Sequence, residues 1–108
     1  MNKYRTHNCN QLRLEDASSN VSLAGWINRK RDHGNVLFVD LRDHYGVTQC
    51  VIEKTNTKLL NLVDSLRVET VIKIDGTVIK REPDTINKSL NTGTIEIAVY
   101  SVEVLSEA

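Results

Sequence analysis

The sequence predicts an all-β domain, a closed barrel of five strands with one short helix between the third strand and the fourth. Two patterns indicate this fold class. Apolar and polar residues alternate through five segments, which is the period of a strand with one buried face. Between the third and fourth segments the apolar residues instead recur at intervals of three and four, as on one face of a helix. A chain of 108 residues fits one such domain and leaves little room for a second.

A polar segment precedes the first strand. Residues 1–20 have no periodicity and are interpreted as a lead-in that ends in a turn, and residues 21–106 as the folded domain. The first strand is expected over residues 21–30, where Gly25 interrupts it, as glycine does where a strand bends or bulges. A short loop is expected over residues 30–35. The inward residues of this strand are expected to be Val21, Leu23 and Ile27.

The next two strands are expected over residues 36–43 and residues 47–53, joined by a turn at residues 44–46. Because successive side chains point to opposite faces, each strand presents one parity to the core and the other to the outside. The second-strand residues with the core-facing parity are Leu37, Val39 and Leu41.

Residues 56–67 are expected to form the helix, with Asn56 or Thr57 as its N-cap. The fourth strand is expected over residues 68–82, with Gly76 in its middle. Mid-strand glycines suit the strong coiling of a five-stranded barrel. The apolar stripe of the helix comprises Leu59, Leu62, Val63 and Leu66.

A polar loop over residues 83–93 has about the length at which loops carry function more often than structure. The last strand is expected over residues 94–105, in which Glu96, Ala98 and Tyr100 face away from the core. Three strands, a helix and two strands are the chain order of the OB-fold, a Greek-key barrel. Its strand 2–3 face and its loops 1–2 and 4–5 bind oligonucleotides. The inward residues of the last strand are expected to be Ile95, Ile97 and Val99.

The composition excludes several classes of protein. Lys and Arg total 14 and so do Asp and Glu, so no global field attracts nucleic acid and any such partner needs a local patch. Cys9 and Cys50 have no metal-ligand spacing, which favours free thiols in a reducing compartment over a disulfide. No apolar run reaches the roughly 18 residues of a membrane span. The polar N-terminus lacks a signal core, and we therefore expect a cytoplasmic location.

Phe38 is expected to face outward. If the aliphatic residues of the other parity fill the barrel, Phe38 must stand on its outer surface. The reverse parity would expose three branched side chains and bury Asp40. An outward aromatic on strand 2 of an OB-fold is a platform for base stacking, which contributes about 1–3 kcal/mol per base.

Polar residues expected near Phe38 favour RNA binding. Gln49 can share its face, and an amide offers both a donor and an acceptor to a base edge such as that of uracil. Glu96 would repel phosphate, but its carboxylate can accept hydrogen bonds from the N–H groups of guanine. The alternative is that Glu96 merely keeps the strand soluble. A basic run at the end of the first strand can neutralise phosphates or stack on bases, although such a run is often only a solvated cluster. This run is Arg29, Lys30 and Arg31.

These residues form a longer frame, GW, RRRDxG, FxDxRD and GxxQ, in which Lys30 takes the place of the second arginine. It is met by Gly25, Trp26, Arg29, Lys30, Arg31, Asp32, Gly34, Phe38, Asp40, Arg42, Asp43, Gly46 and Gln49. The frame closely resembles the N-terminal anticodon-binding domain of bacterial-type aspartyl-tRNA synthetases, which belong to class IIb. The segments YRTHNCNQLRL and TGTIEIAV also resemble that family, so the likeness covers nearly the whole chain. Lys30 and Thr94 stand where the family has arginine and glutamate, and the loop containing Pro83 also differs.

The resemblance implies a role for each candidate residue. Phe38 would stack on the central uracil of the aspartate tRNA anticodon, and Gln49 would read the edge of that base. Glu96 would read the first base, a guanine or its queuosine derivative. Arg31 would reach the third base, with Asn87 assisting nearby, and Trp26 is given a packing role.

The resemblance also implies a larger parent enzyme, an aspartate–tRNA ligase that uses ATP and Mg²⁺ and forms a homodimer. Nothing in the chain resembles the catalytic domain, and it has no nucleophile–base set or Gly-rich phosphate loop. We therefore expect no catalytic residue, metal ligand or cofactor in this domain, and we interpret it as part of a longer enzyme.

His33 bears on the choice of tRNA. Some enzymes of this family charge only the aspartate tRNA, and relaxed ones also charge the asparagine tRNA, whose anticodon differs at the third base. A histidine at this position resembles the relaxed group, and a plain solvated histidine is the alternative. Two other functions stay open: the same domain of an asparaginyl- or lysyl-tRNA synthetase, and a stand-alone OB module for single-stranded nucleic acid or a protein partner. One Phe, one Trp and zero net charge disfavour a generic strand binder.

Overall fold

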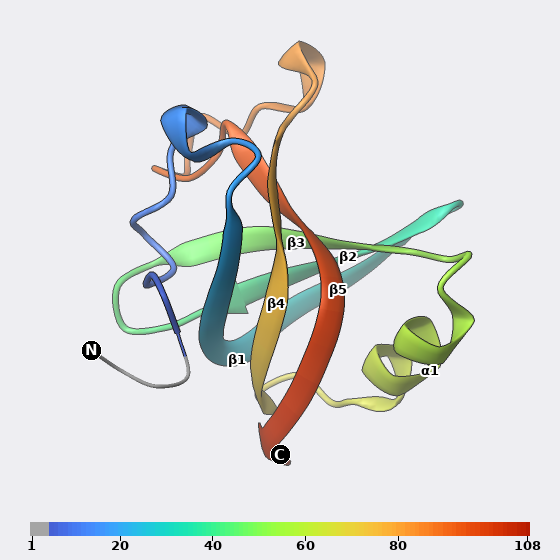
Figure 1. Cartoon of the computed structure of the whole chain (residues 1–108). Coiled ribbons are helices and arrows are strands. Elements are labelled where there is room, and N and C mark those ends of the chain that lie inside the picture. Colours follow the sequence, from blue (N-terminus) through green and yellow to red (C-terminus); the bar gives the residue numbers. More distant parts are fainter. Residues whose placement is uncertain (1–4) are drawn as a thin grey trace.

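The computed structural model describes residues 5–108. Its elements are β1 (Asn20–His33), β2 (Val36–Arg42), β3 (Val47–Glu53), α1 (Thr57–Ser65), β4 (Val71–Lys80) and β5 (Ile95–Ser106), with 3-10 turns at Leu14–Asp16 and Pro83–Thr85. The strands close into a barrel in the order β1-β2-β3-β5-β4, and only β3 and β5 pair in parallel (Figure 1). The expected all-β barrel with one helix between the third and fourth strands is confirmed.

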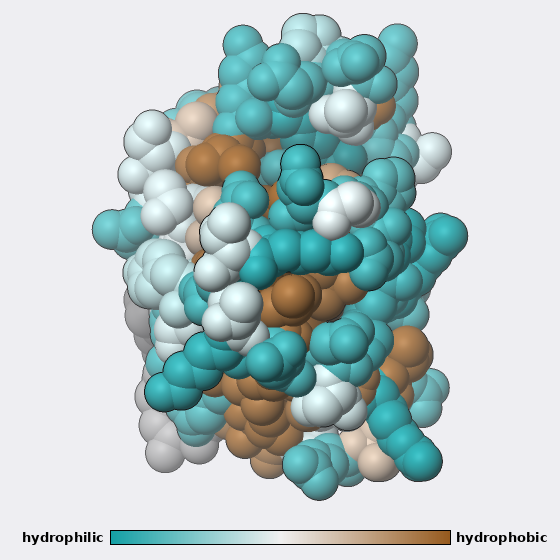
Figure 2. All heavy atoms as spheres, turned by 90° about the vertical axis from the view of Figure 1, so that its right-hand side faces the viewer, coloured by the Kyte–Doolittle hydropathy of each residue, from teal (hydrophilic) through white to brown (hydrophobic). Residues whose placement is uncertain are grey.

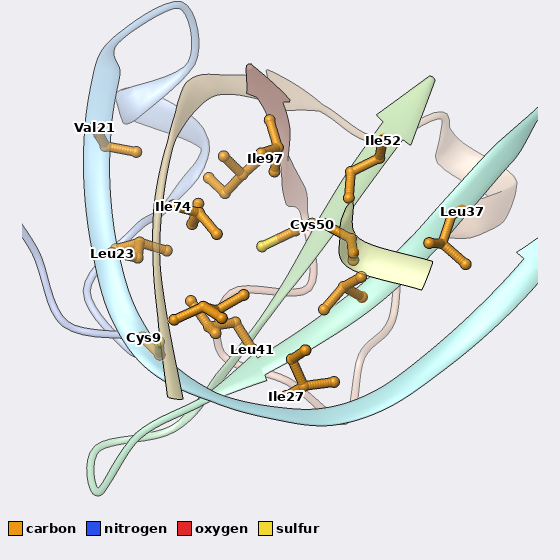
Figure 3. Close-up of a cluster of buried hydrophobic side chains, with 14 of the residues drawn as sticks. Cys9, Val21, Leu23, Ile27, Leu37, Leu41, Cys50, Ile52, Ile74 and Ile97 are labelled. Carbon is orange, nitrogen blue, oxygen red and sulfur yellow. The ribbon is translucent and has the colours of Figure 1, made fainter. Parts of the chain in front are cut away.

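Strand alternation places the core as expected. The apolar residues of one parity are buried in β1, in β2 and in β5 up to Val99, and those of β4 join them. Beyond Val99 the half-buried Val102 and Val104, of the other parity, pack on the core. Figure 3 shows these side chains converging on the interior of the barrel from several strands. The expected inward residues are confirmed: Val21, Leu23, Ile27, Leu37, Val39, Leu41, Ile95, Ile97 and Val99.

The hairpin between β1 and β2 is tighter than the sequence suggested. We expected a loop over residues 30–35, but β1 continues to His33 and only Gly34 and Asn35 form the turn. Gly34 has φ +62°, a left-handed conformation that the favoured two-residue hairpin turns require at their first position. As a result Arg31 and His33 lie on a strand and not in a loop.

Two glycines mark places where backbones come close. Gly25 does not interrupt β1, contrary to expectation, and the irregularity in the pairing with β2 lies between Ile27 and Arg29. A Cβ at Gly25 would lie 2.2 Å from the carbonyl oxygen of Arg42, so a side chain there would push β2 away. A Cβ at Gly76 would lie 2.7 Å from the carbonyl oxygen of Ala98 on the neighbouring strand β5.

The helix α1 packs on the barrel core through its buried side. Asn56 is the N-cap, as one of the two expected alternatives, and its side-chain oxygen accepts from the Leu59 N–H at 3.3 Å. The prediction that Leu62 belongs to the buried apolar stripe is wrong, because this side chain is 37% exposed. The helix therefore contributes a narrower apolar face than its sequence suggested. The buried members are Leu59, Val63 and Leu66.

The described part of the lead-in packs closely against the barrel. Cys9 and Leu12 are fully buried, although the sequence around them is polar and aperiodic. The buried carboxylate of Asp43 accepts from the Cys9 N–H at 2.9 Å, and the Thr48 hydroxyl donates to the Cys9 carbonyl at 2.9 Å. Arg5 forms an ion pair with the same carboxylate at 3.5 Å. The lead-in is thus held by the turn that joins β2 to β3.

Both cysteines are free and buried, which confirms the expectation of thiols over a disulfide. Burial raises the pKa of each thiol, so neither is a reactive thiolate near neutral pH. Over residues 5–108, no helix combines the length and apolar content that a membrane crossing requires. The same residues contain no group of three His, Cys, Asp or Glu that could hold a metal ion.

Candidate nucleic-acid interface

The outer face of β1, β2 and β3 carries the candidate residues in cross-strand register. Phe38 on β2 lies opposite Arg31 on β1 and Val51 on β3. One step along, Asp40 lies opposite Gln49. Cross-strand partners share a face of the sheet, so these side chains stand together on the outside of the barrel.

Phe38 faces outward, as expected, and forms a half-buried platform. The ring of His33 meets it edge-on, with centroids 5.2 Å apart and planes at 71°. The guanidinium carbon of Arg31 lies 5.3 Å from the centroid of the Phe38 ring, in cation–π range. Both neighbours come from β1, and they limit the rotamers that the aromatic ring can adopt.

Four polar side chains from four strands form one hydrogen-bonded chain, which we call the four-residue network. Its members are Asp40, Arg31, Gln49 and Glu96. Nη2 of Arg31 donates to Oδ1 of Asp40 at 2.9 Å and to Oε1 of Gln49 at 2.7 Å. Nε2 of Gln49 donates to Oε1 of Glu96 at 2.8 Å. Gln49 is only 6% exposed, and the hydrogen bonds on its two sides hold its amide at the wall of a neighbouring hollow.

A polar hollow of about 500 Å³ opens beside this network. It lies between the barrel wall and the loop that joins β4 to β5. Four cationic side chains and a single carboxylate line it, which makes the hollow attractive to an anion although the chain as a whole is neutral. The lining residues are Arg29, Arg31, Asp40, Gln49, Arg81, Thr85, Ile86, Asn87, Lys88 and Leu90.

Arg81 is the cation that sequence reasoning missed. It follows β4 directly and is only 5% exposed. Its Nε–H donates to the Ile95 carbonyl and its Nη1 to the Thr85 carbonyl, each at 3.0 Å. Burial lowers the pKa of this guanidinium, and the carboxylates of Glu96 and Asp40 oppose that shift. The available signal was parity, because Arg81 shares the outward parity of β4 residues.

Lys30 does not join the other candidates. Alternation along β1 places it opposite Val39, on the core side of the strand. Its Nζ instead donates to the carbonyls of Asp64 and Leu66 at 3.0 and 2.6 Å, at the C-terminal end of α1. The expectation that all three cations of the basic run lie beside Phe38 is therefore wrong, and only those at positions 29 and 31 line the hollow.

Asn87 lies at the rim of the polar hollow in the β4–β5 loop. Its side-chain oxygen accepts from the Ser89 N–H at 2.9 Å, and its backbone N–H donates to the Gly93 carbonyl at 3.1 Å. Further along the loop, Asn91 donates to the side chain of Asn10 at 3.1 Å. The lead-in therefore helps to hold the loop that forms one wall of the hollow.

Trp26 lies away from these residues. Its ring meets that of His44 edge-on at 5.4 Å, near the turn between β2 and β3. It lines a separate hollow together with Tyr45 and Leu105. The packing role expected for Trp26 agrees with this position, outside the candidate interface.

The chain resembles known proteins over nearly its full length. A family model described as OB-fold nucleic acid binding domain matches residues 21–105. A protein of Pelagibacter ubique named aspartate–tRNA(Asp/Asn) ligase is 53% identical over 105 residues, 97% of this chain and 18% of the relative. A protein of the same name from Phenylobacterium zucineum is 54% identical over all 108 residues, again 18% of the relative.

The fold is also found in solved structures. An aspartyl-tRNA synthetase from Entamoeba histolytica superimposes with a TM-score of 0.82 at 23% identity, over 93% of this chain and 21% of the other. At that identity the likeness concerns the fold alone. The chain spans about a fifth of the length of the curated relatives described above.

Proposed function

The chain belongs to the family of OB-fold nucleic acid binding domains, and we propose that it reads the anticodon loop of the aspartate tRNA as one domain of an aspartate–tRNA ligase. One observation carries this proposal: the Phe38 platform, the four-residue network and the cationic hollow adjoin one another on one face. A stacking ring, base-reading polar groups and a cationic groove are what recognition of single-stranded RNA uses. The names of the 53% and 54% identical relatives support the choice of amino acid.

Each side chain has a role that suits its position. Phe38 stacks the central uracil, and Gln49 on the neighbouring strand β3 offers that base a donor and an acceptor. Glu96 accepts from the first base, a guanine or queuosine, whose Watson–Crick edge presents donors. Arg31 reaches the third base, and Asn87 contacts the loop from the rim of the hollow.

Cations of the polar hollow hold the RNA backbone. Arg29 and Lys88 line the hollow at exposed positions, where they neutralise phosphates. Arg81 lies deeper and contributes a fixed charge and hydrogen-bond donors. Lys30 is given no phosphate contact, because its ammonium group is engaged at the end of α1.

The rest of the activity belongs to the whole protein. We propose that this chain contributes tRNA recognition to an enzyme that activates aspartate with ATP and Mg²⁺, works as a homodimer and resides in the cytoplasm. The described residues supply no candidate for the chemical step, and the chain covers 18% of its named relatives. A larger catalytic part is what the remaining length of such an enzyme would provide.

We further propose that the enzyme is relaxed and also charges the asparagine tRNA. His33 stands next to the Phe38 platform, on the β1 side that Arg31 also occupies. A side chain there can influence how the third base is held. Both highly similar relatives carry the Asp/Asn designation in their names, which supports this choice.

Titration with RNA stem-loops tests the proposed function. Three loops on one stem, with anticodons GUC, GUU and an unrelated triplet, are added to the 108-residue chain at low, stated salt. Equal binding of GUC and GUU, with much weaker binding of the third, is expected. Binding of GUC alone would keep the aspartate assignment and remove the relaxed one. Equal binding of all three would replace anticodon reading by a generic OB surface.

A further inference from the structure

Asp40 is an acid in an unfavourable place. It stands on the outer face of β2, two residues from Phe38, and it lines the cationic hollow. Its side chain is 17% exposed. A carboxylate at an RNA-binding surface repels phosphate, so its presence calls for a compensating role. That role is visible in its ion pair with Arg31, at 2.9 Å.

Hydrogen-bond chemistry fixes the amide of Gln49 through its neighbours. A guanidinium can only donate, so Arg31 must face the oxygen of the amide. An ionised carboxylate can only accept, so Glu96 must face the nitrogen. The two neighbours therefore impose one of the two flip states of the amide, and one lone pair and one N–H remain for a ligand.

The flip state decides which pyrimidine fits. Uracil presents an N–H donor at N3 beside carbonyl acceptors, whereas cytosine presents an acceptor at N3 beside an amino donor. An amide held in one orientation places its free N–H and its free oxygen opposite matching groups of one pyrimidine. For the other pyrimidine it places donor against donor and acceptor against acceptor. An amide free to flip satisfies both.

Arg31 can impose this orientation only while it is itself held. Both N–H groups of its Nη2 are used, one on Asp40 and one on Gln49. Asp40 and Phe38 are the partners that keep the guanidinium over the sheet. Without the carboxylate, a long and flexible side chain would be free to turn toward solvent or phosphate.

We propose that Asp40 is a positioning residue that sets the discrimination of uracil from cytosine at the central base, acting through Arg31 on the amide of Gln49 and touching no RNA itself. This inference rests on the proposed function, in which Gln49 reads that base. It assigns a role in base recognition to Asp40, although the negative charge of this residue opposes RNA binding.

The inference is tested by binding two stem-loops, with anticodons GUC and GCC, to three proteins. These are the wild-type chain, Asp40→Ala and Asp32→Ala. Asp32 is the matched control, because it is an exposed acid near the end of β1 that pairs with Lys54 outside the network. Each variant removes one negative charge. If charge alone matters, each variant should therefore bind both loops at least as tightly as the wild type, with no change in the ratio of the two affinities. Asp40→Ala is expected to lower the GUC-to-GCC affinity ratio about tenfold, and Asp32→Ala to leave it unchanged.

A double variant separates positioning from a direct effect. Because Asp40 acts through Arg31, Arg31→Met should lower the ratio by itself, and adding Asp40→Ala should lower it no further. Thermal melts of each variant check that the barrel stays folded. A wild-type ratio in Asp40→Ala, or additive losses in the double variant, would overturn the positioning role. A wild-type chain that binds both loops equally would instead overturn the proposed function, and this inference with it.

Discussion

At the scale of single residues, neighbouring positions on β2 have opposite tasks. Leu37 and Val39 fill the core, while Phe38 between them is half-buried on the outer face. The ring is flanked by Arg31 and His33 from β1, and its neighbour on β3 is Val51, which is buried but lies outside the interior core cluster. Its removal should therefore take away a stacking surface without opening a large cavity in the barrel.

Phe38→Ala is expected to weaken binding of the GUC stem-loop by about 1–3 kcal/mol, the contribution of one stacked base. The free energy of unfolding should change by no more than about 1 kcal/mol, as for most surface substitutions. Tyr100→Ala is the control, because Tyr100 is an aromatic residue that is 56% exposed and lies outside the polar hollow. Fluorescence titration and urea unfolding measure both quantities. Unfolding of Phe38→Ala, or undiminished RNA affinity, would show that the ring is not a platform.

At the scale of elements, alternation along β1 divides the basic run between two tasks. Arg29 and Arg31 face the hollow, and Lys30 faces the end of α1. Its ammonium group meets carbonyls that the helix leaves without internal partners, and a cation is favourable there. A basic run in a sequence is thus not by itself a binding patch.

Lys30→Met should destabilise the fold by about 1 kcal/mol, since the end of α1 loses its charged donor. Its RNA affinity should depend on salt as the wild type does. Arg29→Met, one residue away, should have the opposite effects. Its stability should be unchanged, and the slope of log affinity against log salt concentration should be smaller by about 0.7. Urea unfolding and titrations at several salt concentrations check the pair. A reduced salt slope in Lys30→Met would contradict its assignment to the helix.

The faces of the strands could be predicted from the sequence, but the β1–β2 hairpin and the lead-in could not. Residues 32–35 of the hairpin are exposed, and residues 30 and 31 are half-buried cations that make polar contacts, so residues 30–35 are polar without alternation and resemble a loop. Within residues 5–20, the described part of the lead-in, only Cys9 and Leu12 are fully buried, which is too few to make a period. The attachment of the lead-in depends on Asp43, which lies far away in the sequence.

Asp43→Ala tests that attachment. The substitution removes the acceptor of the N–H groups of Cys9, Tyr45 and Gly46. Because buried donors lose their partner, the barrel should lose about 1–3 kcal/mol of stability. Cys9 should then react with a thiol reagent much faster than in the wild type, while Cys50 inside the barrel stays protected. Equal exposure of both thiols would mean that the whole barrel opens and that the lead-in is not a separate, releasable part.

At the scale of the whole molecule, a neutral chain carries a locally cationic hollow. Hydrophilic residues cover most of the face that Figure 2 shows, with apolar atoms visible between them. Phe38, Gln49 and Glu96 could be assigned to the outside from parity alone. The hydrogen bond that joins Gln49 to Glu96 could not be predicted, because it requires the barrel to close and bring β3 beside β5. Arg81 reaches the hollow through the closed barrel as well, because it follows β4, which pairs with β5.

Gln49 is proposed to read the central base of the anticodon, and changing this residue and that base together tests the assignment. Affinities of wild type and Gln49→Ala are measured for stem-loops with anticodons GUC and GCC on one stem. Gln49→Ala is expected to lose about 1–3 kcal/mol of binding free energy on GUC, the contribution of a good bidentate base contact, and little on GCC. Equal losses on both loops would contradict it, because Gln49 would then support the surface without reading the base.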